Sequence, residues 1–320
     1  MEISISAETA LGLSWPQWKR LVPVIEQLGF AGIFVSDHFD ASGSPQATAL
    51  ELIVALAYIA DHTSRVHFGS LVAPLSVRDP IMLVRQAAAL DALSGGRMRL
   101  GLGAGWDESE HTMFGYPLGD VATRMDRLGE GLAIATGLLR TTEPFSYDGR
   151  FYHVHNAVLA GPRRVGGPPL LIGGKGPKRT LPLVARYADI WNAQKLTPEG
   201  FRQHSALLDT LLDEVGRPRS AVKRTLAALV FCGRTEAELE QHAGWVRLLN
   251  PDWADPPIDT LIDNLRPIIS VIAGTPEAVV QQINAYAAVG VEELMIQWGA
   301  FDDLEGLELL AEQVLPYVST

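Results

Sequence analysis

The sequence predicts a (β/α)8 barrel, and three observations support that fold class. Short β-type runs alternate with amphipathic helical stretches along the 320 residues, eight such runs can be counted, and a helical stretch ends the chain. This order indicates a parallel sheet covered by helices, and eight strands favour a closed barrel over an open doubly wound sheet, the second choice. We expect one domain, 1–320, with insertions after the fourth and seventh strands, at 141–169 and 234–272.

The strands and helices can be placed from periodicity and helix-start signals. The predicted strands are Glu2–Ser6, Gly32–Asp37, Val66–Val72, Met98–Gly103, Leu170–Gly173, Asp189–Ala193, Thr225–Phe231 and Glu293–Gln297. The predicted helices are Trp15–Leu28, Ala47–Asp61, Ile81–Leu93, Thr123–Leu139, Pro198–Val215, Glu277–Val289 and Glu305–Val314. Asp79-Pro80, Thr197-Pro198 and Thr275-Pro276 each place a capping side chain before a proline, a typical helix start.

The two insertions interrupt this alternation. Turn residues and aromatics around Tyr147-Asp148-Gly149 predict a hairpin over the barrel mouth within 141–169. Residues 234–272 follow the seventh strand, and we expect one or two extra helices there.

Composition excludes several classes of function. The net charge of −11 argues against nucleic-acid binding, and Cys232 is the single cysteine, so neither an intramolecular disulfide nor a cysteine metal cluster is possible. The longest apolar run, Leu52 to Ala60, is too short to cross a membrane. The first residues lack the basic and apolar regions of an export signal, so we expect a cytoplasmic protein without membrane partners.

Candidate catalytic residues follow the first two strands. Function in such barrels concentrates at the carboxyl ends of the strands. Because side chains alternate between the two faces of a strand, Ser36 and His38 lie on one face of the second strand and Asp37 on the other. A histidine there can transfer a proton near neutral pH, and Glu8, after the first strand, can face it across the mouth. We therefore predict His38 as the general acid/base, with Glu8 and Asp37 orienting it or holding charge.

Glycine-rich segments follow the fourth and fifth strands. Gly101, Gly103 and Gly105 leave space for a flat ring near the strand ends, and Trp106 follows them. After the fifth strand, 173–180 reads Gly-Gly-Lys-Gly-Pro-Lys-Arg-Thr before a helix, which predicts a phosphate cradle of backbone amides with local positive charge. Glu110-His111 has no companion ligands at metal spacing, so no metal site is predicted.

Together these segments resemble the luciferase-like monooxygenase superfamily, in the branch that uses the deazaflavin coenzyme F420. The resemblance covers most of the chain. The segments that carry it are Val35–Phe39, Gly101–Trp106, Glu110-His111, Ile172–Gly176, Tyr187–Asn192 and Gly274–Glu277.

The resemblance implies a cofactor ring in the barrel mouth and a phosphate near the fifth strand. Family members commonly carry a non-prolyl cis peptide in a bulge of the third strand, and the matching bond here is Ser70-Leu71. The implied cofactor-binding residues are Asp37, Ser70, Leu71, Ala73, Ala104, Gly105, Gly173, Gly174, Lys175 and Gly176. The implied substrate pocket contains Trp106, His111 and Trp191. The resemblance also implies a homodimer formed through outer helices.

Two departures concern the substrate. The F420-dependent sugar-phosphate dehydrogenases carry an acid where this chain has Trp106 and a tryptophan where it has Ser42. These differences disfavour glucose 6-phosphate and favour a flatter, more apolar substrate.

The predicted function is hydride transfer between F420 and a carbonyl, an alcohol or an activated alkene. One alternative is an FMN-dependent monooxygenase supplied by a partner reductase, since both cofactors carry a phosphate and a similar ring. A second alternative is a non-catalytic flavin-binding barrel.

Overall fold

Eight parallel strands close into a barrel. The computed structural model describes residues 1–39, 48–161, 164 and 166–319. Around the barrel, each strand pairs with the next, and the last pairs with the first. The order is β1 (Glu2–Ala7), β2 (Gly32–Val35), β3 (His67–Ser70), β5 (Met98–Gly103), β8 (Leu170–Gly173), β9 (Ile190–Ala193), β10 (Lys223–Cys232) and β12 (Glu293–Trp298). All eight predicted strands are present, and the predicted (β/α)8 fold class is confirmed.

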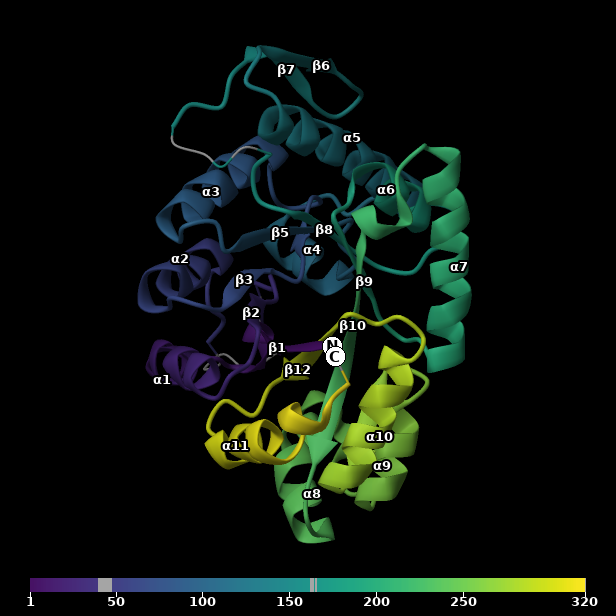
Figure 1. Cartoon of the computed structure of the whole chain (residues 1–320). Helices are drawn as coiled ribbons and strands as arrows, with labels where there is room; N and C mark the ends of the chain where they lie inside the picture. The colour runs from purple at the N-terminus through teal and green to yellow at the C-terminus, as the bar shows by residue number, and fades with distance from the viewer. Residues whose placement is uncertain (40–47, 162–163, 165, 320) are drawn as a thin grey trace.

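Helices surround the barrel (Figure 1). They are α1 (Trp15–Gln27), α2 (Leu52–His62), α3 (Pro80–Leu93), α4 (Glu108–Phe114), α5 (Val121–Arg140), α6 (Thr180–Tyr187), α7 (Pro198–Glu214), α8 (Glu236–Ala243), α9 (Ile258–Leu265), α10 (Pro276–Ala287) and α11 (Leu304–Gln313). The three predicted caps form, because Asp79, Thr197 and Thr275 each accept a hydrogen bond from a first-turn amide. The prediction for α2 was wrong at its start: Glu51 caps this helix, so it begins five residues after Ala47, which lies outside the described residues.

The segment after β10 contains a strand as well as helices. α8 and α9 agree with the one or two helices expected there, and β11 (Val271–Gly274) was not predicted. β10 is long enough for two neighbours on one edge: Lys223–Leu226 pairs with β9, and Leu229–Cys232 pairs with β11. A separate apolar cluster joins β10 and β11 to α8 and α9.

The predicted hairpin forms between β6 (Phe145–Asp148) and β7 (His153–Ala157). It packs on the outer helix α5. The side chain of Glu130 on α5 accepts hydrogen bonds from the amides of Arg150 and Phe151 at 2.8 and 2.9 Å. These contacts hold the hairpin against the ring of helices and not over the mouth, where it was predicted to lie.

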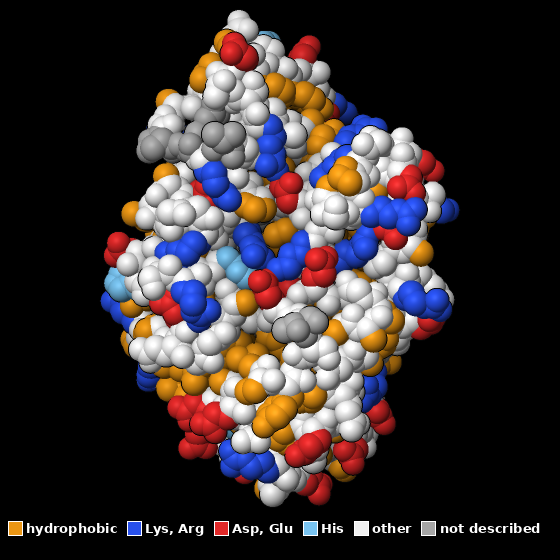
Figure 2. Space-filling model, in the orientation of Figure 1, with side chains coloured by type: hydrophobic (Ala, Val, Ile, Leu, Met, Phe, Trp, Pro, Cys, Tyr) orange, Lys and Arg blue, Asp and Glu red, His pale blue; other side chains and the backbone are white. Residues whose placement is uncertain are grey.

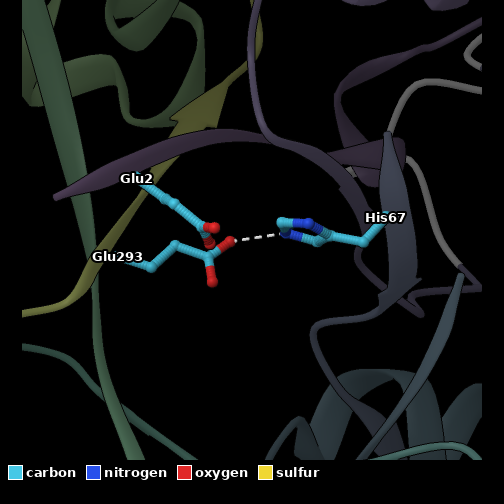
Figure 3. A group of neighbouring side chains, drawn as sticks. All are labelled: Glu2, His67 and Glu293. Carbon is cyan, nitrogen blue, oxygen red and sulfur yellow. Dashed lines mark hydrogen bonds and ion pairs between the residues drawn. The ribbon is translucent and has the colours of Figure 1, made fainter. Parts of the chain in front are cut away.

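The barrel interior is built in layers by alternate residues of the strands. The middle layer is apolar and contains Phe34, Leu171, Ile190 and Met295. Below it, where the strands begin, the fully buried Glu293 accepts hydrogen bonds or ion pairs from Ser4, His67, Arg99 and Lys223 at 2.6 to 2.8 Å. Figure 3 shows Glu2, His67 and Glu293 turned toward one another from β1, β3 and β12. This charged layer closes the amino-terminal end of the barrel.

Basic and acidic side chains gather at the centre of the face shown in Figure 2, over the strand starts. The amino terminus lies at this face, beside the carboxy terminus (Figure 1). In the part of the chain that the structure describes, no helix is long and apolar enough to cross a bilayer.

Candidate active site

His38 and Glu110 form a hydrogen-bonded pair at the carboxyl end of β2. Nδ1 of His38 lies 3.2 and 3.1 Å from the two carboxylate oxygens of Glu110, and the amide of Phe39 donates to the same carboxylate at 2.7 Å. Glu110 lies in the first turn of α4, where Asp107 caps the helix by accepting from the Glu110 amide. Because Nδ1 faces a carboxylate, it carries the proton, and Nε2 is the nitrogen available to a substrate.

The surroundings of His38 favour its charged form. Burial by itself lowers the pKa of the imidazole, but the hydrogen bond and charge of Glu110, with the charges of Glu8 and Asp107, outweigh it and raise the pKa above its usual value. His38 is therefore suited to hold a proton near neutral pH and to give it up to a bound oxygen atom.

Glu8 follows β1 and lies near His38, as predicted for the two residues across the mouth. The side-chain amide of Gln297 on β12 donates to the Glu8 carboxylate at 3.0 Å, and the Ser6 hydroxyl lies 3.5 Å from the same carboxylate. Burial raises the pKa of Glu8, and the Gln297 hydrogen bond and the charge of His38 only partly oppose this. The mouth therefore holds two neighbouring groups that can exchange protons.

Asp37 lies on the opposite face of β2 from His38, as the alternation predicted, and pairs with a cation. Arg78 donates to both of its carboxylate oxygens, at 2.9 and 2.6 Å, and to Glu51 at 2.8 Å. Burial lowers the pKa of Arg78, but the bonds from these two acids outweigh it and raise the pKa above its usual value. The predicted orienting role belongs to Glu110 by geometry, because Asp37 is committed to Arg78.

The floor of the mouth is formed by the break between β3 and β4 (Ala73–Pro74). The non-prolyl cis peptide lies at Leu71-Val72, so its predicted position, Ser70-Leu71, was wrong by one bond. The Val72 side chain lies over the neighbouring strands β5 and β8. A Cβ added at Gly103 would lie 2.5 Å from it, and a Cβ added at Gly173 would lie 3.2 Å from it. A Cβ at Gly101 would meet the carbonyl oxygen of Ser70 at 1.9 Å. The glycines thus accommodate Val72 and the Ser70 backbone.

The turn from β8 to α6 has the geometry of an anion cradle. Gly174 has a φ of 121°, its amide donates to the carbonyl of Asn192 at 2.9 Å, and Trp191 donates its indole N–H to the Gly174 carbonyl at 2.7 Å. Within the described chain, no acceptor binds the backbone amides of Lys175 and Gly176. These free donors beside a helix start fit a phosphate.

The cradle and His38 lie at the same end of the barrel. The Val72 side chain lies beside the β8 end, where a Cβ at Gly173 would be 3.2 Å from it, and the preceding residue, Leu71, donates its amide to the carbonyl of Val35 at the end of β2. Ala73 and Ala104 lie on the same rim, and Gly105 there has a positive φ of 80°.

The three predicted substrate-pocket residues differ in exposure. Trp106 is 72% exposed and packs edge-on against the His38 ring, 5.8 Å between centroids. His111 is buried on α4, with Nδ1 near the carbonyl of Asp107 and no partner at Nε2 among the described residues. Trp191 is fully buried and stacks on Phe201 of α7, so it supports the cradle turn from behind. Ser42 lies outside the described residues.

Two side-chain groups bring potential metal ligands together: His38, Asp107 and Glu110, and Glu2, His67 and Glu293. In the first, Glu110 already bonds His38 and the Phe39 amide. In the second, Lys223 contacts both Glu2 and Glu293, and its charge opposes a metal cation there.

Sequence reasoning missed several residues of this site. Glu110 was considered as a metal ligand and as part of a family segment, but not as the partner of His38, because 72 positions separate the two residues. Gln297 had a usable signal, since alternation from Glu293 through Met295 points it into the barrel. Arg78 and Val72 had no signal in the sequence pattern.

The fold is a parallel barrel with titratable side chains and a glycine-rich turn at one end, an arrangement suited to a cofactor-dependent barrel enzyme. Residues 2–293 match the family model described as luciferase-like monooxygenase, and the chain belongs to that family.

Similar proteins include both dehydrogenases and monooxygenases. An F420-dependent glucose-6-phosphate dehydrogenase of Intrasporangium calvum is 26% identical over 91% of each chain. A 4-hydroxyprotoasukamycin monooxygenase of Streptomyces nodosus subsp. asukaensis is 27% identical over 82% of this chain and 72% of its own. An F420-dependent secondary alcohol dehydrogenase, solved with an F420-acetone adduct, superposes with a TM-score of 0.81 at 18% identity, covering 100% of this chain and 99% of its own.

Proposed function

We propose that the protein transfers a hydride between coenzyme F420 and a carbonyl, an alcohol or an activated alkene. The observation that carries this proposal is the shared position of the His38–Glu110 pair and the Gly173–Gly176 cradle at one end of the barrel. Family membership and the F420-dependent relatives support it.

The residues at the mouth fit a phosphate-bearing cofactor. The free amides of Lys175 and Gly176 would hold the phosphate, with Gly173 and Gly174 keeping the turn open. Ser70, Leu71, Ala73, Ala104 and Gly105 line the rim on which the ring would rest. The deazaflavin would supply the carbon that gives or accepts hydride. Contact of Asp37 with the cofactor stays a prediction, because Arg78 already binds both of its carboxylate oxygens.

His38 would move the proton that accompanies hydride transfer. Its Nε2 would donate to the carbonyl oxygen during reduction, or accept the hydroxyl proton during oxidation. Glu110 fixes the tautomer through Nδ1, and Glu8 holds a second proton position nearby. Positioning these groups before the substrate arrives removes much of the entropic cost of the reaction.

The chemistry around His38 favours a neutral, apolar substrate. The carboxylates of Asp107 and Glu110 lie near the histidine, and their charge would repel a phosphorylated substrate. Trp106 offers a flat apolar surface against the same ring. Both features favour an apolar ketone, alcohol or alkene over a sugar phosphate.

An FMN-dependent monooxygenase served by a reductase is the alternative function, and the monooxygenase relative supports it. The same amides would hold the FMN phosphate, so the cradle alone does not choose between the cofactors.

Titration of the purified protein with F420 and with FMN, followed by cofactor fluorescence, tests the choice. The proposal expects F420 to bind at least tenfold more tightly, and mass spectrometry of natively purified protein should find it. Tighter binding of FMN would favour the monooxygenase.

We also propose a homodimer formed through α2 and α3. Val54, Met82 and Leu93 on these helices are about half exposed, at 53%, 49% and 58%, and apolar residues lie on all sides of both helices. Sedimentation analysis should find a dimer, and Met82→Lys should weaken it.

A further inference from the structure

Two lysines from neighbouring loops lie together at the outer edge of the cradle. Lys175 belongs to the β8–α6 turn and Lys195 to the loop between β9 and α7. The ammonium of Lys175 donates to the carbonyl oxygen of Lys195 at 2.6 Å. The charge of Lys195 acts on that of Lys175, so two positive charges lie near each other in a chain whose net charge is −11.

No acidic side chain neutralises this pair among the described residues. The salt bridges of the described chain include neither lysine, whereas nearby Arg179 pairs with Asp126. Glu199, four residues after Lys195, binds Arg202 and Gln203 instead. Burial and the charge of Lys195 both lower the pKa of Lys175, as expected for two cations without an anion between them.

The loops that carry the lysines are held rigidly. The β8–α6 turn is fixed by the Gly174 amide and by the Trp191 indole. The second loop is fixed at Leu196, whose amide donates to Ser270 and whose carbonyl accepts from the Tyr286 hydroxyl. Lys195 itself has a left-handed backbone, with a φ of 57°, which is uncommon for a residue other than glycine. Rigid donors lose little entropy when an anion binds.

We propose that Lys175 and Lys195 form a second anion subsite, which takes a carboxylate that the cofactor carries beyond its phosphate. This inference rests on the proposed function. F420 carries carboxylates on the chain that follows its phosphate, whereas FMN ends at its phosphate. The subsite would therefore distinguish the two cofactors where the amides of the cradle do not.

The test uses Lys195→Gln, because Lys195 lies outside the cradle turn. The matched control is Lys19→Gln, on the exposed face of α1, which changes the net charge equally. Both variants and the wild-type protein are titrated with F420 and with FMN at low and high salt. We expect Lys195→Gln to raise the Kd for F420 about three- to tenfold at low salt, less at high salt, and to leave the Kd for FMN within twofold.

The outcomes separate this inference from the proposed function. If the wild-type protein binds F420 and Lys195→Gln behaves like Lys19→Gln, the subsite is refuted and the proposed function stands. Equal weakening of both cofactors would also refute the subsite, since it would indicate a general effect on the cradle. If the wild-type protein binds FMN alone, or neither cofactor, the proposed function and the subsite both fail.

Discussion

The imidazole of His38 contacts Glu110 through Nδ1 at 3.1 Å, so a residue of α4 sets the protonation of a residue that follows β2. Glu110 also binds the amide of Phe39, which fixes the backbone next to the histidine. The pair joins two segments that close the same side of the mouth, and it makes the chemistry of His38 dependent on the position of α4.

Removal of the His38 imidazole should abolish proton transfer and leave the cofactor site intact. We expect His38→Ala to lower turnover about 10²- to 10⁴-fold with little change in cofactor Kd. His155→Ala, an exposed histidine of β7, is the control. Turnover close to wild type in His38→Ala would remove this residue from the mechanism.

Glu110→Gln should shift the pH profile of carbonyl reduction. The folded-state pKa of His38 is raised, chiefly by Glu110 against the opposing effect of burial, so protonated His38 persists to higher pH than usual. Reduction needs that proton, so activity is high below the pKa of His38 and falls as the pH rises through it. The variant should lose activity at lower pH than the wild type does. The control Glu108→Gln should leave the fall in activity at high pH unchanged. If Glu110→Gln also left it unchanged, Glu110 would not set the pKa of His38.

The two glycines of β5, Gly101 and Gly103, should respond differently to substitution by alanine. A Cβ at Gly103 meets only the Val72 side chain, at 2.5 Å, whereas a Cβ at Gly101 meets the Ser70 carbonyl oxygen. Each alanine should destabilise the protein by about 1–3 kcal/mol. In urea unfolding, adding Val72→Ala to Gly103→Ala should restore the lost stability. Adding Val72→Ala to Gly101→Ala should not. Equal rescue of both would contradict the assigned contacts.

Glu293 should matter for stability rather than for cofactor binding. Glu293→Gln leaves Arg99 and Lys223 without their buried partner, which should cost about 3–5 kcal/mol. Although burial alone would raise the pKa of Glu293, His67, Arg99 and Lys223 lower it well below its usual value. The ionised group therefore stabilises the fold above its unfolded pKa of about 4.3, and this stability is lost as the pH falls toward the folded pKa.

Urea unfolding at neutral and acidic pH measures this effect, with Glu312→Gln on the exposed face of α11 as the control. The difference in the free energy of unfolding between Glu293→Gln and the wild type should be smaller at acidic pH than at neutral pH. A constant difference would contradict the ionised state of Glu293.

The eight barrel strands could be predicted because each is a short apolar run bounded by turns and separated by helical periodicity. β11 could not be predicted, since Val271–Gly274 is a brief run that, within the described residues, pairs with the second half of β10 and no other strand. Helix α4 was missed because its seven residues are too few for a periodic pattern.

Candidate site residues could be named from the sequence where one strand end suffices, whereas contacts between distant segments could not be predicted. His38, Glu8 and the glycine turn follow directly from their strands. The His38–Glu110 and Asp37–Arg78 pairs depend on how loops fold over the rim, which periodicity does not describe. Trp191 follows Ile190, whose side chain lies in the barrel interior, and it packs outward on Phe201, so its place in the substrate pocket stays a prediction.

Hydride transfer is tested most directly with deuterium-labelled reduced F420, by following the deuterium in single turnovers without oxygen. The protein, loaded with deuterated reduced cofactor, is mixed with a panel of apolar ketones and activated alkenes. We predict that deuterium appears on the carbon of the reduced product and that His38→Ala forms this product far more slowly. Product formation that requires oxygen and incorporates its atoms, with no transfer of deuterium, would contradict the proposed function.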